Sequence, residues 1–319
     1  MIETRGLRKS FRSRQGREKK TVEAVRGVDL LVTEGEIFGF LGPNGAGKTT
    51  TLRMLATLIR PDAGEATIAG VDLRRNPGEV RRRIGYVAQG GSTWDDVTAR
   101  EELVLHARMY GIGKAEAQRR AARALDAFQL TEYADRKCKT YSGGQRRRVD
   151  IALGIIHGPK VVFLDEPTTG LDPQSRAHMW TEIRRLRDEG MTVFITTHYL
   201  DEADALCDRI AIMDYGTVVA EGTPNDLKRE IHGDVVTVGL TGEDTPQAAE
   251  VLDTQPYVTK LETMDEGGLR LYVDTGATAI PQILRTLDGS GLALSSIELH
   301  RPSLDDVFLT KTGRSLRES

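Results

Sequence analysis

The sequence predicts an α/β domain followed by a small α+β domain. Within the first 232 residues, short apolar runs end in glycine-rich or acidic segments, and stretches of helical periodicity separate them. This alternation is typical of a sheet with helices on its faces. After residue 232 the predicted elements follow a βαββαβ order, which is typical of ferredoxin-like domains. We therefore expect two domains, residues 1–232 and 233–319.

Length and composition restrict the class of protein. The chain has 319 residues, of which 39% are hydrophobic and 29% charged, as in a soluble globular protein of about two domains. Its net charge of -3 provides no positive field for nucleic acid, so no nucleic-acid partner is expected. No run of 18 apolar residues is present and the N-terminus lacks a secretory core, so we expect a cytoplasmic chain that meets a membrane only through a partner. The two cysteines, Cys138 and Cys207, are expected to be reduced packing residues.

The first predicted elements are two short edge strands, residues 2–9 and 21–33. A charged turn over residues 11–20 joins them and contains one aromatic residue, Phe11. An aromatic ring at the rim of a nucleotide site can stack on adenine, but a half-buried aromatic at a strand end fits the same pattern. The sequence leaves both interpretations of Phe11 open.

A phosphate-binding loop follows the apolar strand Ile37–Leu41. The motif Gly-x-x-x-x-Gly-Lys-Thr occupies residues 42–49, between this strand and a predicted helix. Side chains at its glycines would block the approach of a polyphosphate to backbone N–H groups. Lys48 can place an ammonium on the β and γ phosphates, and the Thr49 hydroxyl can ligate Mg2+. The alternative is a glycine turn that binds nothing, and the order of strand, loop, Lys-Thr and helix argues against it.

Between this loop and the next motif the sequence predicts two strands and a helical insertion. The strands are residues 65–68, after a turn at 61–64, and residues 84–89, which end in the amide of Gln89. Residues 99–132 are expected to form helices, and their alternating charges favour a solvent-facing surface.

A polar glycine pair opens the next helix. Ser142, Gly143 and Gly144 precede apolar positions at helical spacing between Val149 and Ile155. Serine before two glycines suits a helix N-cap, which is a purely structural role. A serine hydroxyl and glycine N–H groups at a helix start also make an anion site, so two roles remain open.

Two carboxylates, Asp165 and Glu166, follow four apolar residues of a buried strand. In a phosphate-loop protein the first holds Mg2+, directly or through water, and the second can polarise the attacking water. Two acids at a buried strand tip otherwise only lower stability, which favours the functional interpretation. A turn at 170–173 and a helix follow, and the next apolar strand, Thr192–Thr197, leads into His198. A lone histidine is usually a packing residue, but its place one strand beyond the carboxylates favours a role in the site.

The remaining elements end the first domain and build the second. Strands at residues 209–213 and 217–221 bracket a turn, and a helix at 224–231 precedes a change in composition at Gly233. The second domain is predicted as strand, helix, strand, strand, helix and strand over residues 235–240, 245–252, 258–264, 269–273, 278–287 and 292–298. A short capped helix is expected over residues 302–308.

Taken together, these motifs resemble those of an ATP-binding cassette (ABC) ATPase over residues 2–232, which implies a phosphate-loop fold with a mixed sheet and a helical subdomain. The matching segments are residues 42–49 with Walker A, Gln89 with the Q-loop, Tyr141–Gln145 with the signature motif, residues 161–166 with Walker B, Asp172 with the D-loop and His198 with the switch histidine. The signature usually starts with Leu, where this chain has Tyr141.

The resemblance implies roles for particular side chains. Glu166, His198 and Gln89 would act in catalysis, and Thr49, Gln89 and Asp165 would bind Mg2+. The nucleotide contacts that it implies come from Phe11, Gly42, Pro43, Asn44, Gly45, Ala46, Gly47, Lys48, Thr49, Thr50, Ser142, Gly143, Gly144 and Asp172.

ATP and Mg2+ are the cofactors that the resemblance implies, and a second copy of the chain is the first partner. Cassettes of this family pack head to tail, so that Ser142, Gly143 and Gly144 of one copy close on the γ-phosphate held by Lys48 of the other. ATP would then join the homodimer and hydrolysis would release it.

The small second domain and the segment Pro302–Phe308 make the chain similar to the ATPase subunits of daunorubicin/doxorubicin-resistance-type exporters. Residues 85–91 and 197–204 carry the same resemblance. In that group a separate ABC-2-type permease provides the membrane path, and the ATPase lies peripherally on the cytoplasmic side of the cell membrane. The implied function is ATP-driven efflux of a drug, antibiotic or lipid-like substrate, with residues 90–110 facing the permease.

Two alternatives accompany this interpretation. A non-transport ABC ATPase would act on ribosomes or DNA, but such proteins usually fuse two cassettes or insert coiled coils, and this chain has one cassette and no heptad run. In the other alternative the second domain senses a ligand and gates the dimer, which is compatible with export.

Overall fold

The computed structural model describes residues 1–15, 18–231, 233–240, 244–264 and 268–313. They divide into two compact units, one of residues Met1–Gly222 and one that begins at Thr223. The sequence prediction assigned the helix near residue 224 to the first domain. In the structure this helix, α8 (Pro224–Arg229), packs on α11 (Leu304–Thr312) of the second unit, and Nζ of Lys311 lies 3.1 Å from Oε2 of Glu230.

A six-stranded sheet forms the centre of the first unit, with the order β10-β9-β3-β8-β7-β6. All neighbouring strands are parallel except the first pair in this order, β10 and β9, which is antiparallel. Its strands are β3 (Ile37–Leu41), β6 (Ile84–Val87), β7 (Val161–Asp165), β8 (Thr192–Thr197), β9 (Arg209–Asp214) and β10 (Thr217–Gly222). Strands that are buried on both faces consist of continuous apolar residues, which explains why the sequence predicted these strands.

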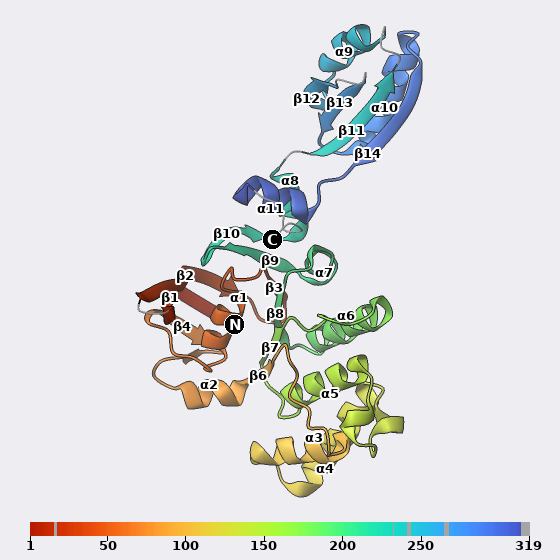
Figure 1. Cartoon of the computed structure of the whole chain (residues 1–319). Coiled ribbons are helices and arrows are strands. Elements are labelled where there is room, and N and C mark those ends of the chain that lie inside the picture. The colour runs from red at the N-terminus through yellow and green to blue at the C-terminus, as the bar shows by residue number, and fades with distance from the viewer. Residues whose placement is uncertain (16–17, 232, 241–243, 265–267, 314–319) are drawn as a thin grey trace. The chain divides into compact units, whose positions relative to one another are not determined.

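Helices cover both faces of this sheet (Figure 1). Helix α1 (Lys48–Leu55) lies on one face, and α5 (Gly143–Ile155), α6 (Pro173–Asp188) and α7 (Leu200–Leu206) lie on the other. The core includes aromatic rings around Phe194, whose centroid lies 5.5–5.6 Å from those of Phe38, Phe40 and Phe163. The predicted α/β class of this domain is confirmed.

A second, antiparallel sheet with the order β2-β1-β4-β5 packs on the α1 side. Its strands are β1 (Ile2–Gln15), β2 (Glu18–Val32), β4 (Ala63–Ile68) and β5 (Val71–Asp72). Both predicted strands are present, and β2 lies at the edge of the sheet as predicted. The prediction was wrong on their length and on the place of the first strand, because β1 and β2 form one long hairpin and β1 lies between β2 and β4. The outer part of the hairpin is polar and charged, so its sequence has no apolar alternation that predicts strands.

The helical insertion is confirmed as α3 (Ala99–Met109) and α4 (Lys114–Ala127), followed by 3-10 turns at Thr131–Tyr133 and Cys138–Thr140. Thr98 and Glu101 form a reciprocal capping box at the start of α3. A further helix that the sequence analysis did not predict, α2 (Pro77–Arg83), precedes β6. None of the described helices is both long and apolar enough to span a membrane.

The second unit contains a four-stranded antiparallel sheet with the order β12-β13-β11-β14, which is the ferredoxin-like arrangement that the sequence predicted. Its elements are β11 (Asp234–Leu240), α9 (Thr245–Asp253), β12 (Val258–Thr263), β13 (Leu269–Val273), α10 (Gly276–Gly289) and β14 (Leu294–His300). Alternate strand residues such as Val236, Val238 and Leu271 are buried in a core with Ala248 and Ile283 of the two helices. The residues between them, such as Val235 and Tyr272, face away from this core.

Candidate active site

Four neighbouring parallel strands carry many of the predicted site residues at their carboxyl ends. In sheet order, β3, β8, β7 and β6 lead into the glycine loop, His198, the pair Asp165 and Glu166, and Gln89. Parallel strands end at the same edge of a sheet, so segments that are distant in sequence meet there. The strands are buried, and therefore a rigid core holds this edge.

The glycines of the loop are required for reasons that differ from the predicted one. A Cβ at Gly42 would lie 2.2 Å from the carbonyl oxygen of Met213, and one at Gly47 would lie 2.3 Å from that of Ala24. Gly45 has open space around it but a φ of 80°, in the left-handed region that favours glycine. The protein backbone behind the loop therefore already excludes side chains at two of the three positions.

The helix that follows the loop starts without a side-chain cap. Gly47 is the N-cap residue of α1, and no side chain accepts a hydrogen bond from the first turn. The N–H groups of residues 48–50 have no acceptor within the helix, because they belong to its first turn. A hydrogen bond of 3.2 Å from the Ala46 N–H to the Pro43 carbonyl closes the loop into a turn. Such a loop and helix start form a site for an anion.

Lys48 is only 4% exposed and lies against this loop. Its Nζ donates to the carbonyl oxygens of Gly42 (2.6 Å) and Pro43 (3.0 Å), and it lies 3.8 Å from Oε1 of Glu166. Burial lowers the pKa of the ammonium, and the negative charges of Glu166 and Asp165 oppose this effect. The loop carbonyls hold the cation beside the position that a phosphate would take.

Thr49 and Asp165 form the oxygen pair that could hold a divalent cation. The Thr49 hydroxyl donates to Oδ1 of Asp165 over 3.1 Å, and the Thr196 hydroxyl donates to the same oxygen over 2.7 Å. A hydroxyl and a carboxylate are hard oxygen donors, which fit Mg2+ when phosphates and water provide its other ligands. The described residues contain no group of three or more His, Cys, Asp and Glu side chains placed for a metal, in keeping with such a sparse donor set. Gln89 contacts Glu166 rather than this pair, and its role as a metal ligand stays a prediction.

Glu166 lies at the centre of the cluster and is 7% exposed. Its Oε2 accepts hydrogen bonds from Nε2 of Gln89 (2.8 Å) and Oγ1 of Thr169 (3.2 Å), and Nδ1 of His198 lies 3.3 Å from it. The proximity of His198 lowers the pKa of the Glu166 carboxyl, although burial acts in the opposite direction. The carboxylate is therefore ionised at neutral pH and can accept a hydrogen bond or a proton from water. Its backbone has a φ of 44°, which is uncommon for a residue with a side chain.

Ser142 is confirmed as the N-cap of α5. Its hydroxyl accepts from the Gln145 N–H (3.2 Å), and the Gln145 side chain accepts from the Ser142 N–H (2.9 Å). Ser142 and Gly143 are nevertheless exposed, so this helix start also faces solvent. Within the described part of the chain, no hydrogen bond or ion pair joins Ser142 to Lys48 or Glu166.

Two other predicted nucleotide contacts also lie outside the cluster. Asp172 caps α6, and its carboxylate accepts from the N–H (2.9 Å) and hydroxyl (2.6 Å) of Ser175. Phe11 pairs with Val22 in the middle of the β1–β2 hairpin, which excludes the position at a strand end. Its ring is 43% exposed and carries Nζ of Lys9 at 5.6 Å from the centroid. The nucleotide contacts of both residues stay predictions.

Two residues of this site were missed in the sequence. Thr196, whose hydroxyl binds Asp165, belongs to the apolar strand β8, where a lone threonine suggests only β propensity. Arg147 lies in a run of three arginines and is buried, 6% exposed. It precedes the apolar residue Ile151 by four positions, so helical periodicity could have placed it on the buried face of α5.

A cavity of about 450 Å³ lies beside the cluster. It is bounded by Gln89 and the residues that follow it, by Gly143 at the start of α5, and by residues 169–171. Three segments that the sequence motifs identified separately therefore line one space.

Comparisons with known protein families match both units. Residues 25–169 match the family described as ABC transporter. Residues 222–312 match the family described as ATP-binding protein DrrA1-3-like, C-terminal domain, and this match begins at the boundary between the two compact units.

Similar proteins extend over nearly the whole chain. The daunorubicin/doxorubicin resistance ATP-binding protein DrrA of Streptomyces peucetius is 45% identical over 98% of this chain and 92% of its own length. The linearmycin resistance ATP-binding protein LnrL of Bacillus subtilis is 36% identical over 100% of both chains. Among solved structures, the ATP-binding cassette MJ0796, a dimer in a post-hydrolysis state bound to ADP and Pi, is 28% identical, covers 70% of this chain and 98% of its own, and has a TM-score of 0.63.

Proposed function

This chain belongs to the ATP-binding subunits of ABC transporters with a DrrA-like C-terminal domain, and we propose which of its residues bind ATP, hydrolyse it and transmit the result to a membrane partner. Its reaction is the hydrolysis of ATP to ADP and phosphate, coupled to transport. One observation carries the residue assignment: the glycine loop, Lys48, Asp165, Glu166 and His198 converge at one edge of the sheet.

The glycine loop and the start of α1 bind the β and γ phosphates. On binding, the Lys48 ammonium moves from the carbonyls of Gly42 and Pro43 to the phosphate oxygens. Thr49 and Asp165 would hold Mg2+, and the bound ion would neutralise phosphate charge. This part of the site is complete within one copy of the chain.

Glu166 accepts the proton of the attacking water. Its low pKa keeps the carboxylate ionised, and the hydrogen bonds from Gln89 and Thr169 fix the direction of Oε2. His198, 3.3 Å from the same oxygen, is placed to contact the γ-phosphate and Glu166 together. Because Gln89 donates a hydrogen bond to Glu166, a change in the nucleotide site is transmitted to Gln89.

The exposed start of α5 completes the site of a second copy. Ser142 and Gly143 are solvent-accessible at a helix N-terminus, and among the described hydrogen bonds and ion pairs none joins them to Lys48 of the same protomer. A head-to-tail homodimer bound to ATP gives them an anionic partner, the γ-phosphate of the other copy. The dimeric arrangement of the similar cassette MJ0796 supports this proposal.

The surface that meets the permease is formed by residues between Gly90 and Tyr110. Large apolar side chains are exposed there: Trp94 (61%), Leu105 (48%), Met109 (75%) and Tyr110 (42%). Exposed apolar groups of this size mark a surface for protein contact. The partner is an ABC-2-type permease, the chain lies peripherally on the cytoplasmic side of the membrane, and the names of the similar proteins favour an antibiotic or drug as cargo.

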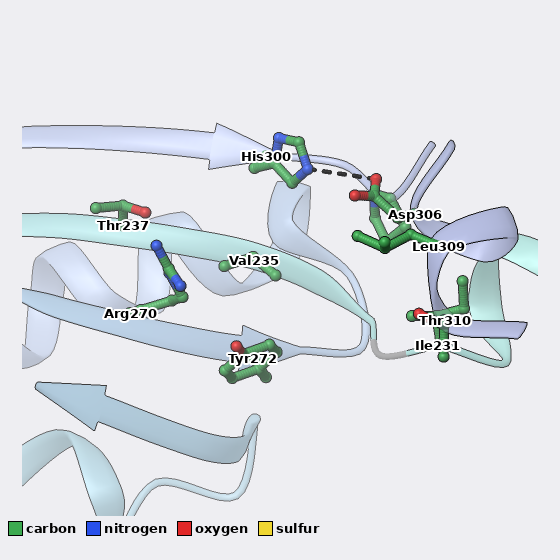
Figure 2. Close-up of a pocket in the computed structure, with 10 residues that line it drawn as sticks. Ile231, Val235, Thr237, Arg270, Tyr272, His300, Asp306, Leu309 and Thr310 are labelled. Carbon is green, nitrogen blue, oxygen red and sulfur yellow. Dashed lines mark ion pairs between the residues drawn. The ribbon is translucent and has the colours of Figure 1, made fainter. Parts of the chain in front are cut away.

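The second unit offers a specific observation for the ligand-sensing role. A cavity of about 490 Å³ lies between the outer face of its sheet and α11 (Figure 2). Val235 on β11 and Arg270 and Tyr272 on β13 line it, and His300 pairs with Asp306 at 3.6 Å on its rim. An apolar wall beside a guanidinium suits an aromatic anion.

1-Anilinonaphthalene-8-sulfonate is a suitable probe of this cavity because it is an aromatic anion. A saturable rise in its fluorescence that Arg270→Gln and Tyr272→Ala both reduce would support ligand binding there. Equal fluorescence in the wild type and both variants would argue against it.

Capture of the tagged chain from detergent-solubilised membranes tests the transport role. A protein with several membrane spans should be recovered, and Met109→Asp should reduce its recovery at least several-fold. Leu58→Asp, which changes another exposed apolar residue (53% exposed) outside the proposed surface, is the matched control. Recovery of ribosomes or DNA without a multi-span protein would favour the non-transport alternative.

A further inference from the structure

Helix α5 carries a buried guanidinium behind the candidate active site. The three nitrogens of Arg147 donate to three backbone carbonyls, those of Ala88 (Nη1, 2.6 Å), Asp165 (Nη2, 3.1 Å) and Pro167 (Nε, 2.8 Å). The first of these residues precedes Gln89, and the other two flank Glu166. One planar group therefore joins the backbone on both sides of the hydrogen bond between Gln89 and Glu166.

The same helix holds the other end of the Gln89 loop through Asp150, which is 4% exposed. Oδ1 of Asp150 accepts from the N–H and hydroxyl of Ser92 (2.8 and 3.3 Å) and from those of Thr93 (3.0 and 2.6 Å). A Cβ at Gly91 would lie 2.8 Å from Oδ2 of Asp150, and Gly91 has a φ of 74°. A side chain at position 91 would be strained at this φ and would crowd the carboxylate, so glycine favours this approach of the loop.

Arg147 and Asp150 are three residues apart, so they lie on the same side of α5. Burial lowers the pKa of the Arg147 guanidinium, and the charges of Asp150 and Asp165 favour the charged form. Hydrogen bonds to ionised groups are stronger than neutral ones, and a rigid helix connects the two attachment points. Gln89, which donates a hydrogen bond to Glu166, lies between these two attachment points.

The tethered loop continues directly to the proposed permease surface. The Trp94 N–H donates to the buried carboxylate of Glu102 on α3 (3.2 and 3.3 Å), and Arg146 of α5 pairs with Asp95. Trp94 itself is 61% exposed. A short chain segment thus connects an exposed tryptophan with Gln89, which donates a hydrogen bond to Glu166, and side chains of α5 and α3 hold this segment.

We propose that Arg147 and Asp150 are positioning residues that hold the Gln89 loop against Glu166, so that a movement of α5 or of the Trp94 segment changes the rate of hydrolysis. This inference rests on the catalytic roles proposed for Gln89 and Glu166. It differs from a simple packing role, because packing predicts lower stability without a specific loss of kcat.

Steady-state ATPase kinetics of Arg147→Met test the proposal. We expect kcat to fall about 10- to 100-fold with the KM for ATP within about threefold, because the geometry of Glu166 is lost while the phosphate loop stays intact. Arg147→Lys should recover part of kcat. Arg148→Met is the matched control, since Arg148 lies on the same helix and donates to the Phe128 carbonyl (3.0 Å) without contacting the loop.

Fluorescence anisotropy provides a second readout. The chain has two tryptophans, so Trp94 is the single reporter in a Trp180→Phe background. Release of the loop in Arg147→Met or Asp150→Asn should lower the anisotropy of Trp94, whereas Arg148→Met should leave it unchanged. An unchanged anisotropy in the first two variants would contradict the proposed attachment.

Thr93→Val gives a milder test if Arg147→Met does not fold, because it removes one donor at 2.6 Å from Asp150. It should lower kcat about three- to tenfold, and Asp150→Asn should add little to that loss. Fully multiplicative losses, or equal losses in Arg147→Met and Arg148→Met, would overturn the proposal. The ATPase rate of Glu166→Gln is measured in parallel. A wild-type rate in Glu166→Gln would refute the catalytic roles proposed for Gln89 and Glu166. A slow rate in Glu166→Gln together with a wild-type rate in Arg147→Met would refute only the positioning role.

Discussion

Replacement of Glu166 by glutamine tests the centre of the proposed mechanism. Glutamine keeps the side-chain length and one acceptor oxygen. Gln89, Thr169 and His198 all lie 2.8–3.3 Å from Oε2, so the remaining oxygen must occupy this position. The amide nitrogen then takes the place of Oε1, 3.8 Å from the Lys48 ammonium, where it can neither attract the cation nor accept a proton.

Loss of the proton acceptor predicts a fall in kcat of about 10²- to 10⁴-fold. The glycine loop and the two carbonyls that hold Lys48 are unchanged, so the KM for ATP should stay within about threefold of the wild type. Because ATP then persists in the site, size-exclusion chromatography should show a dimer that accumulates with ATP and dissociates when ATP is removed.

Phosphate release, binding of a fluorescent ATP analogue and size exclusion measure these three effects. Glu182→Gln is the matched control, since Glu182 is also buried, 5% exposed, but binds Arg185 outside the cluster. Turnover by Glu166→Gln above about a third of the wild-type rate would refute the role of proton acceptor. An equal loss of ATP binding would instead show that Glu166 shapes the phosphate site.

Three further predictions concern stability and nucleotide affinity. Burial raises the pKa of Glu102 to about 7, so the folded state binds a proton more tightly than the unfolded state, and the free energy of unfolding falls as pH rises from about 4.5 to 7. Glu102→Gln should remove this pH dependence. In urea titrations it should raise the free energy of unfolding by about 2–3 kcal/mol at pH 8 and leave it unchanged at pH 4. Gly47→Ala should lower the free energy of unfolding of the first unit by more than about 2 kcal/mol and abolish ATP binding. Gly45→Ala, whose Cβ would have no atom within contact distance, should lower it by about 1–2 kcal/mol, and equal unfolding midpoints of the two variants would refute this order. Phe11→Ala should raise the Kd for ATP about tenfold if the ring stacks on adenine, and a change below twofold would exclude stacking.

Much of the fold could be predicted from the sequence, because parallel strands that are buried on both faces appear in it as continuous apolar runs. Ile37–Leu41, Val161–Asp165 and Thr192–Thr197 are each buried throughout, and each was predicted within about one residue. The outer part of the hairpin of β1 and β2 gives no such signal, because its residues are polar and charged and its strands are held by backbone pairing, whereas the inner part buries apolar residues such as Val28 and Val32. The same difference explains why Phe11 was predicted in a turn and lies within a strand.

The sequence by itself determined the chemistry of the site. A glycine loop with Lys48 and Thr49, two acids after an apolar strand, and a histidine after the next strand define a phosphate-binding ATPase, because each residue type has few other uses at such a position. Their order along the chain was sufficient to identify the family.

Only the tertiary structure decided what each of these residues contacts. It showed that backbone carbonyls of Met213 and Ala24 require Gly42 and Gly47 to be glycine, and that α5 places Arg147 behind Glu166. The physical reason is that these contacts join segments far apart in the chain, and local propensity holds no information on such pairs. Which of the three consecutive arginines is buried depends on the backbone carbonyls that the fold places around its guanidinium, and around Arg147 these are the carbonyls of Ala88, Asp165 and Pro167.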